Sequence, residues 1–254
     1  MAYQIIGCFK KDAMAERLYR EIGQKIRLEI EKSALKVGEK LPTERVYAEL
    51  FGVSRTLVRE AFIMLEIEEL IEVRKGSGSY LKNALSSPVS LPEISDVGPF
   101  EMLQARQVLE SAIAAQTAGY ITKADIQKLQ ETLELEGAEL NSVEKANAAD
   151  REFHLLIAKA TQNTLLLDMA TRLWEMRDSN PMWHQLHARI KDSSYHGQWI
   201  DDHKDILTQL KKRSESGVRQ AMWQHLENVK QTLFSLSDTD APDFDGYIFS
   251  QPNK

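Results

Sequence analysis

Four side chains of types that ligate metal ions recur at helical spacing in the second half of the chain. Asp150 and His154 are four residues apart, and Ile157 follows them on the same helical face. His203 and His225 each share a face with apolar residues, so each is expected to point into a protein interior. If these four side chains converge inside the protein, they form a nitrogen and oxygen ligand set suited to Zn²⁺, Ni²⁺ or Mn²⁺. The alternative is three separate core histidines, each satisfied by a neighbour, which the inward direction of all four side chains disfavours.

A cation, Arg106, lies in an otherwise apolar helical stripe with Leu103, Glu110 and Ile113. A buried guanidinium needs an anionic partner. Glu110, one helical turn later, could supply that partner as a structural ion pair. Alternatively, Arg106 could clamp the carboxylate of a sugar acid whose remaining oxygens complete the coordination of the metal.

The segment NPMWHQLH, residues 180–187, combines an aromatic ring with two imidazoles. Trp183 offers a flat apolar face for a sugar ring, and His184 and His187 could donate hydrogen bonds to hydroxyl groups. The same residues could equally fill a gap in the core as a loop plug.

The segment GVSRTLVREAF, residues 52–62, places two arginines one helical turn apart. Arg55 and Arg59 would share a helical face, from which a guanidinium can bind the N7 and O6 atoms of guanine. The hydroxyl groups of Ser54 and Thr56 could reach phosphates or bases. The alternative is that the arginines form exposed ion pairs with nearby glutamates, which contribute little to stability.

The first 82 residues predict three helices followed by a β-hairpin. Thr43 and Ser54 are the expected N-caps of the second and third helices. This order is typical of a winged helix-turn-helix, in which the third helix enters the major groove of DNA. The expected elements are helices at 15–32, 44–51 and 55–69 and strand segments at 70–73 and 80–81.

Three further residues fit DNA contacts in that geometry. Arg45 stands one turn into the second helix and would face the backbone or an adjacent base. Lys75 and Gly76 lie at the expected hairpin tip, where glycine permits close approach of the backbone to a minor groove and lysine meets phosphate. The sequence therefore predicts DNA contacts at Arg45, Ser54, Arg55, Thr56, Arg59, Lys75 and Gly76.

Beyond residue 83 the chain shows only helical periodicity after a segment rich in proline and serine. We expect a mainly α protein, with an antiparallel all-helical bundle behind the winged helix-turn-helix. The predicted division is a DNA-binding domain at 14–83, a linker at 84–98, a ligand-binding and dimerisation domain at 99–236 and a tail at 237–254. The predicted helices of the bundle are 98–120, 122–140, 144–160, 163–178, 199–213 and 215–236, and the stretch between 178 and 199 is expected to be irregular at its start.

Charge is distributed unevenly between these parts. Residues 1–82 hold 15 Lys and Arg against 13 Asp and Glu, whereas residues 83–254 hold 17 against 25. The first part can therefore approach an anionic polymer while the second remains acidic. The first residues do not show the basic and then apolar segments of a signal peptide, and the sequence lacks a long apolar run. A cytoplasmic location without membrane contact is therefore expected.

Residues 36–81, KVGEKLPTERVYAELFGVSRTLVREAFIMLEIEELIEVRKGSGSYL, resemble the winged-helix domain of the GntR family. The segments GPFEMLQARQVLESAIA, NPMWHQLH and AMWQHLENVK resemble the helical ligand-binding domain of its FadR-like branch, and among that branch the regulators of hexuronate utilisation. The resemblance implies a homodimer on a palindromic operator in double-stranded DNA. Leu57 departs from the threonine of the fatty-acid-responsive member, so a shared operator sequence is not implied.

The resemblance also assigns roles to individual residues. The DNA-reading residues of the family match Arg45, Arg55, Thr56 and Arg59, with a wing glycine at Gly76. The ligands of its metal-binding members match Asp150, His154, His203 and His225. The candidate effector-binding residues remain Arg106, Glu110, Trp183, His184 and His187.

Two classes of function follow from these residues. A metal-dependent enzyme acting on sugar acids would need a general base beside the metal, but the sequence has no HExxH motif, P-loop or paired catalytic carboxylates. A transcriptional regulator needs only a DNA-reading helix and an effector site. The sequence therefore favours a repressor of sugar-acid catabolism genes, with no enzymatic activity, that a carboxylate sugar releases from its operator.

Overall fold

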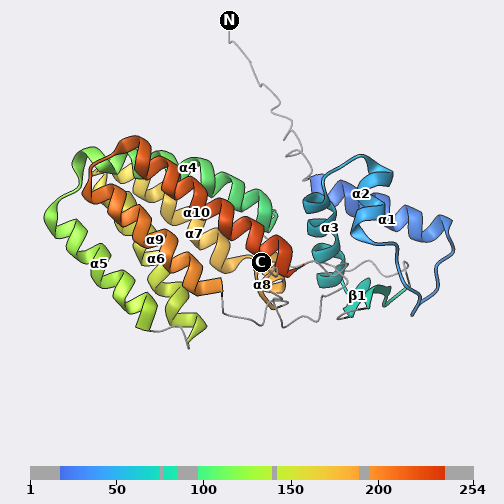
Figure 1. The fold of residues 1–254 in the computed structure, drawn as a ribbon. Coiled ribbons are helices and arrows are strands. Elements are labelled where there is room, and N and C mark those ends of the chain that lie inside the picture. Colours follow the sequence, from blue (N-terminus) through green and yellow to red (C-terminus); the bar gives the residue numbers. More distant parts are fainter. Residues whose placement is uncertain (1–17, 75–76, 85–96, 139–141, 189–194, 238–254) are drawn as a thin grey trace, which may run out of the picture.

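The computed structural model describes residues 18–74, 77–84, 97–138, 142–188 and 195–237. Those residues form ten helices and two strands, which confirms the mainly α fold class (Figure 1). None of the helices in these ranges is both long enough and apolar enough to cross a membrane.

Three helices open the described chain: α1 (Leu18–Lys32), α2 (Glu44–Phe51) and α3 (Arg55–Ile67). The predicted caps are confirmed, since the hydroxyl of Thr43 accepts a hydrogen bond from the Val46 amide and that of Ser54 accepts one from the Leu57 amide. Gly52 ends α2 in the left-handed region at φ 65°, a conformation that glycine adopts without a steric penalty. Helix α3 ends two residues earlier than expected, and Glu69 follows with a positive φ of 59°.

The predicted hairpin is confirmed as an antiparallel pair, β1 (Ile71–Arg74) and β2 (Gly78–Leu81). Its register pairs Ile71 with Leu81 and Arg74 with Gly78. Both Ile71 and Leu81 are buried, and they join the core formed by α1 and α3. The described part of the hairpin therefore packs as a wing against the three helices.

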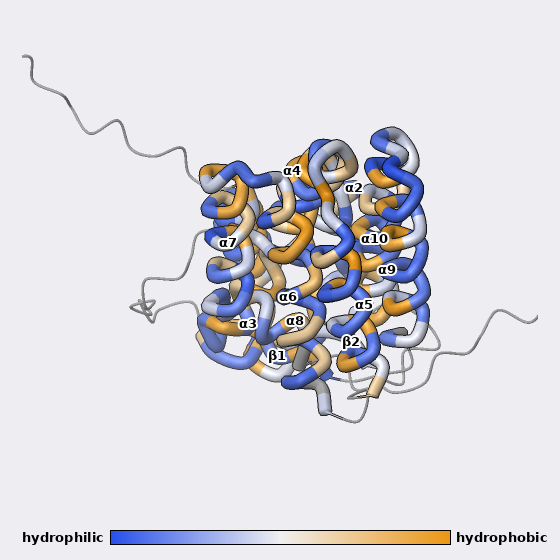
Figure 2. The backbone as a smooth tube through the Cα atoms, turned by 90° about the vertical axis from the view of Figure 1, so that its left-hand side faces the viewer, coloured by the Kyte–Doolittle hydropathy of each residue, from blue (hydrophilic) through white to orange (hydrophobic). Residues whose placement is uncertain are grey.

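The second part is a bundle in which α10 runs beside α4 and α9, while α5 packs against α6 and α9 (Figure 1). Apolar and polar stretches alternate along tubes such as α5 and α7, as amphipathic bundle helices require (Figure 2). The predicted capping box is confirmed, because the amide of Asp125 donates to the hydroxyl of Thr122 and the amide of Thr122 donates to the Asp125 carboxylate. The bundle helices are α4 (Pro99–Tyr120), α5 (Lys123–Ala138), α6 (Val143–Ala160), α7 (Thr164–Ser179), α9 (Tyr195–Lys211) and α10 (Glu215–Leu236).

The stretch expected to be irregular at its start contains a helix, α8 (Pro181–Ala188), so that prediction was wrong. Asn180 acts as its cap, because its side-chain oxygen accepts hydrogen bonds from the amides of Met182 and Trp183. Pro181 occupies the first helical position, where its missing amide costs nothing. The Asn-Pro pair is thus a helix start rather than a loop signal.

The two parts of the molecule share buried surface. Met182 and Leu186 of α8 and Leu233 of α10 belong to the same apolar cluster as Phe62 of α3. In Figure 1, α8 and the C-terminal end of α10 lie at the end of the bundle that faces α3. The bundle has a second, separate core that includes Phe153 and Ile206. Helix α3 is therefore packed directly against the helical domain.

Candidate functional site

The start of α3 carries the residues predicted to read DNA. Arg45, on α2, is exposed and pairs with Glu49 across 3.1 Å. Arg55 and Thr56 are partly buried, and the Arg55 guanidinium lies 5.5 Å from the centre of the Phe234 ring of α10. The Ser54 side chain caps the helix. Lys75 and Gly76, the predicted wing contacts, lie outside the described residues.

Arg59 is not exposed, contrary to the role predicted for it. Its side chain is fully buried and forms an ion pair with Glu44 in which Nη2 lies 2.6 Å from Oε2. Its Nη1 donates to the Phe234 carbonyl oxygen and to Ser237 Oγ, and the guanidinium lies 4.1 Å from the centre of the Phe234 ring. In this arrangement Arg59 connects α3 to α2 and to the end of α10, and no DNA groove can reach it.

The neighbouring residue, Glu60, makes a second connection between the two parts. Its Oε1 accepts hydrogen bonds from the amides of Phe100 and Glu101, in the first turn of α4. Burial raises the pKa of Glu60 to about 7, although these amide hydrogen bonds lower it. An added Cβ at Gly98 would lie 2.3 Å from the Glu60 carboxylate, so this close approach depends on glycine.

The four predicted metal ligands come together inside the bundle. One ligand atom from each of Asp150, His154, His203 and His225 lies within 4.8 Å of all the others. The Nε2 atom of His203 is 3.3 Å from that of His154 and 3.1 Å from that of His225. Four ligands at tetrahedral Zn–N distances would be separated by about 3.3 Å. The separation of the imidazole nitrogens therefore fits a divalent ion.

Each of the three imidazoles also faces a carboxylate on its other side. His203 Nδ1 is hydrogen-bonded to Glu136 Oε2 at 2.9 Å, and His154 Nδ1 lies 2.6 Å from Glu110 Oε2. His225 Nδ1 is 3.4 Å from a carboxylate oxygen of Asp202. Such partners favour the tautomer protonated at Nδ1, which leaves the Nε2 lone pairs facing one another at the centre of the cluster. That arrangement needs a cation.

The pKa shifts in the cluster differ from one residue to the next. Burial and the neighbouring His203 lower the pKa of His225 to about 3. Burial would also lower the pKa of His154, but Glu110 and Asp150 outweigh it and raise that pKa. Burial alone would raise the pKa of Asp150, whereas His154 and Arg177 hold it well below its usual range. A carboxylate and at least one neutral imidazole are thus available as ligands.

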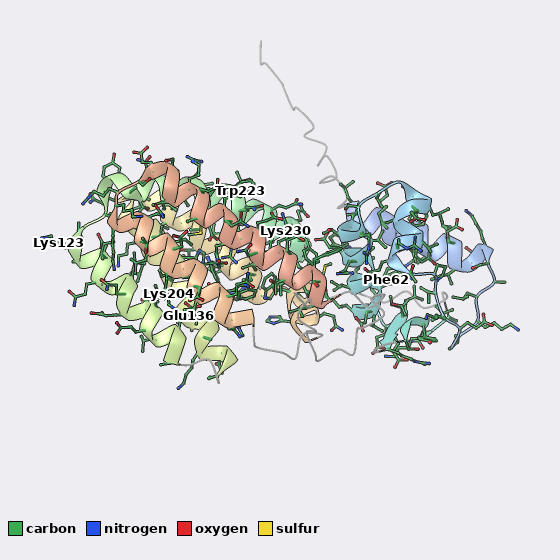
Figure 3. The ribbon with its side chains drawn as sticks, in the orientation of Figure 1. Phe62, Lys123, Glu136, Lys204, Trp223 and Lys230 are labelled. Carbon is green, nitrogen blue, oxygen red and sulfur yellow. The ribbon has the colours of Figure 1, made fainter. Side chains whose placement is uncertain are left out.

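Sequence reasoning missed Glu136 and Asp202, two of the carboxylates that hold the imidazoles. Glu136 lies on α5, 67 residues before its partner His203 (Figure 3). Its position on the buried face of α5 beside Leu129 and Leu133 was the signal, because a glutamate on such a face needs a buried partner. Asp202 directly precedes His203 and carried no comparable signal.

A small pocket opens beside the cluster. Two cluster residues, Asp150 and His225, contribute to its wall. The complete lining is Arg106, Asp150, Arg177, Trp183, Trp199, His225, Leu226 and Val229. Two guanidinium groups, two indole rings and part of the Asp and His cluster therefore meet around one pocket.

Arg106 and Glu110 form the structural pair that the sequence left as one of two interpretations. Arg106 Nε donates to Glu110 Oε1 at 2.7 Å and Nη2 donates to Oε2 at 3.3 Å. Burial raises the pKa of Glu110, but Arg106 and His154 outweigh it and lower the pKa to about 2. Glu110 therefore links Arg106 to His154, one of the four predicted metal ligands.

The predicted binding residues of the NPMWHQLH segment do not all face the pocket. Trp183 is buried, belongs to the apolar cluster that α8 shares with α3, and also lines the pocket, which is compatible with both interpretations of this segment. His184 is exposed, and its Nε2 lies 2.8 Å from the Asp178 carbonyl oxygen, away from the pocket lining. The side chain of His187 lies outside the described residues. Arg177, which sequence reasoning missed, lines the pocket instead; its position on the buried face of α7 with Ala170 and Trp174 was the signal.

Comparison with known proteins places both parts of the chain. The family model described as bacterial regulatory proteins, gntR family, matches residues 18–81. The model of the FCD domain matches residues 101–228, half of the chain. The first match spans α1 to β2, and the second contains all four residues of the metal cluster.

Full-length relatives agree with these matches. An Uxu operon regulator of Haemophilus influenzae is 48% identical over 238 residues, covering 93% of this chain and 90% of that protein. An Uxu operon transcriptional regulator of Escherichia coli K12 is 47% identical, covering 94% and 96%. An Exu regulon transcriptional regulator of the same strain is 40% identical, covering 92% of each chain. This chain therefore belongs to the gntR family of bacterial regulatory proteins, with a helix-turn-helix DNA-binding domain followed by an FCD domain.

Proposed function

We propose that this regulator is a homodimeric repressor of hexuronate catabolism genes, and that a carboxylate sugar bound in the helical domain releases it from a palindromic operator. The observation that carries the proposal is the pocket that joins a buried Asp and His metal cluster to two arginines and two tryptophans. The names of the relatives, regulators of an Uxu operon and an Exu regulon, support hexuronates as the sugar class. The alternative of a metal-dependent enzyme gains no support, because these relatives are transcriptional regulators.

The resident metal in this proposal is zinc, held by Asp150, His154, His203 and His225. Three imidazole nitrogens and one carboxylate oxygen are common zinc ligands, and nickel and manganese accept the same donors. When bound, such an ion supplies a positive centre for carboxylate and hydroxyl oxygens. The protein supplies the orientation of the imidazoles through Glu110, Glu136 and Asp202.

DNA contacts are proposed for Arg45, Ser54, Arg55, Thr56, Lys75 and Gly76, near the start of α3 and on the wing. Arg59 can join them only if its contacts with Phe234 and Ser237 open. Two of the pocket helices reach α3 directly: α4 through Glu60, and α10 through Arg59. Movement of α4 or α10 on effector binding would therefore be transmitted to the DNA-reading helix. The effector must favour the off-operator arrangement by the coupling free energy, typically about 1–3 kcal/mol.

The first experiment is a thermal-shift screen of sugar acids against protein loaded with zinc. A ligand present at about 100 times its dissociation constant stabilises the folded state by roughly 2.7 kcal/mol. We expect hexuronates or their ketose isomers to raise the melting temperature and the corresponding neutral hexoses not to do so. Stabilisation by none of the sugar acids would contradict the assigned effector class.

The second experiment connects the metal to operator release. His203→Ala should reduce metal content and abolish the response of operator binding to the sugar acid, while operator affinity without effector remains close to that of the parent. His184→Ala is the matched control, because this imidazole is exposed and away from the pocket. Loss of operator binding by effector-free His203→Ala would mean that the cluster only maintains the fold.

A further inference from the structure

The guanidinium groups of Arg106 and Arg177 line the effector pocket. They differ in how many of their N–H donors already have close hydrogen-bond partners. Arg106 is committed through two hydrogen bonds to a single carboxylate, Glu110, which in turn contacts His154. These bonds occupy the Nε edge of the guanidinium, so an effector carboxylate that took this edge would displace Glu110, whereas Nη1 and one Nη2 hydrogen are left for weaker contacts. That displacement would also release the imidazole of a metal ligand. Arg106 therefore serves the metal cluster in this structure.

Arg177, on α7, is buried with only 4% of its surface exposed, yet its polar contacts are long. Nη2 lies 3.5 Å from Asn147 Oδ1, and Nη1 lies 4.0 Å from Asp150 Oδ2 and 3.7 Å from Asp178 Oδ1. Its Nε has no hydrogen-bond partner among the described residues. A buried guanidinium with an unused donor is costly unless an anion satisfies it.

The aromatic side chains around Arg177 hold the guanidinium in position. It lies 4.6 Å from the centre of the Trp174 ring and 4.9 Å from that of Trp183. Burial lowers the pKa of Arg177; Asp150 opposes this, Arg106 lowers the pKa further, and Asp178 and Glu110 raise it. The group is thus fixed in place, and Asp150 is the carboxylate that balances its charge most.

Asp150 is shared between Arg177 and the metal cluster. Its Oδ1 lies 3.4 Å from His154 Nε2, on the side of the ligand atoms, while Oδ2 is the atom nearest to Arg177. A cation held by the cluster would draw on the charge of this carboxylate. Arg177 would then have still less negative charge facing it.

We propose that Arg177, rather than Arg106, binds the carboxylate of the effector, and that its planar guanidinium makes the pocket specific for sugar acids over neutral sugars. This assignment rests on the proposed function, since it deepens the effector site described there. A guanidinium binds a carboxylate through two parallel hydrogen bonds, which an amide of the same shape cannot reproduce.

The test compares Arg177→Met and Arg177→Lys with the parent protein, all loaded with zinc. Arg172→Met is the matched control, because this arginine lies on the same helix with an exposed side chain. Binding of D-glucuronate, D-galacturonate, D-glucuronamide, acetate and citrate is measured by calorimetry, and the zinc content of each variant is measured by atomic absorption.

We expect the parent to bind one hexuronate and to discriminate against the uncharged glucuronamide. Arg177→Met should weaken hexuronate binding by about 10- to 100-fold, remove the discrimination against the amide and retain the zinc of the parent. Arg177→Lys should bind hexuronate more tightly than Arg177→Met but less tightly than the parent. A lysine keeps the positive charge but cannot form the two parallel hydrogen bonds of a guanidinium. Arg172→Met should match the parent.

The remaining outcomes separate this proposal from the proposed function. Unchanged hexuronate binding in Arg177→Met, or loss of zinc from both Arg177 variants, would overturn the role of Arg177 while leaving the effector class intact. Binding of citrate or acetate but no hexuronate, lost in Arg177→Met, would retain Arg177 and reject hexuronates. Binding of no carboxylate by the parent would overturn both.

Discussion

At the scale of single residues, the imidazoles of the cluster depend on carboxylates that contribute no ligand atom themselves. Glu136 orients His203 through one hydrogen bond of 2.9 Å, whereas Glu110 lies 2.6 Å from Nδ1 of His154 as an ion-pair partner and also binds Arg106. A ring held in this way presents its Nε2 to the centre of the cluster without a loss of rotamer entropy on metal binding. These supporting carboxylates should therefore control metal affinity.

Glu136→Gln should lower zinc affinity by about 10- to 100-fold, because the amide accepts the His203 Nδ1 proton less strongly than a carboxylate does. Chelator competition measures the affinity, and circular dichroism checks that the helices are retained. Glu134→Gln is the control, since Glu134 lies on the same helix with an exposed side chain. Equal zinc affinity in the parent and Glu136→Gln would show that the hydrogen bond does not tune the site.

At the scale of secondary-structure elements, α3 is held at two points by helices that also line the pocket beside the Asp and His cluster. The first turn of α4 binds Glu60, and the last turn of α10 binds Arg59. Arg59 is itself one of the residues predicted to read DNA, and Glu60 follows it directly. Changes at these contacts should therefore alter operator binding without touching DNA or effector.

Phe234→Ala should strengthen operator binding by effector-free protein, by about 2- to 30-fold, because it removes the ring that stacks on Arg59 and so favours release of the guanidinium. Titration of operator at fixed salt measures the change. Trp223→Ala is the control, since Trp223 lies on α10 and is 40% exposed (Figure 3). Weaker operator binding in Phe234→Ala would indicate that the contact orients α3 for DNA instead of restraining it.

Glu60 should make stability depend on pH. Its pKa is raised by burial from 4.5 to about 7 in the folded state, so the folded protein holds this proton more tightly than the unfolded chain does. The contribution of Glu60 to the free energy of unfolding is therefore fully present below about pH 4.5, and it is lost as the pH rises through about 7. The neighbouring Glu101 contributes in the same direction, whereas the amides of Phe100 and Glu101 oppose it.

Glu60→Gln should accordingly be more stable than the parent at pH 8, by roughly 3 kcal/mol at most, with little difference at pH 5. Urea denaturation at the two pH values measures this difference. Glu72→Gln, on the exposed side of the hairpin, should show no comparable pH dependence. A variant less stable than the parent at pH 8 would mean that the ionised carboxylate is needed at the start of α4.

At the scale of the whole molecule, one winged helix offers few base contacts. Selective operator binding is therefore expected to require two copies whose α3 helices lie about one turn of DNA apart. Sedimentation should report a dimer at micromolar concentration, and footprinting should show two half-sites separated by about 10 base pairs. A stable monomer that protects a single half-site would contradict the palindrome and the dimer together.

Much of the architecture could be read from the sequence because it depends on local interactions. Helical periodicity, the caps at Thr43 and Ser54 and the capping box at Thr122 each involve residues within one or two turns. The inward direction of His154, His203 and His225 follows from the same periodicity. Where a local signal was misread, as at Asn180 and Pro181, the error concerned helix α8 alone.

Only the tertiary structure decided which distant side chains meet. Arg59 pairs with Glu44 and with the end of α10, 175 residues away, so burial overrides the exposed position that its helical spacing suggested. Glu136 reaches His203, and Arg177 reaches the pocket, through the packing of helices whose relative rotation no local pattern encodes. The sequence determined the types of chemistry and the elements that carry them. Long-range packing determined which groups are available for DNA, metal and effector, because the desolvation of each charge depends on neighbours from the whole chain.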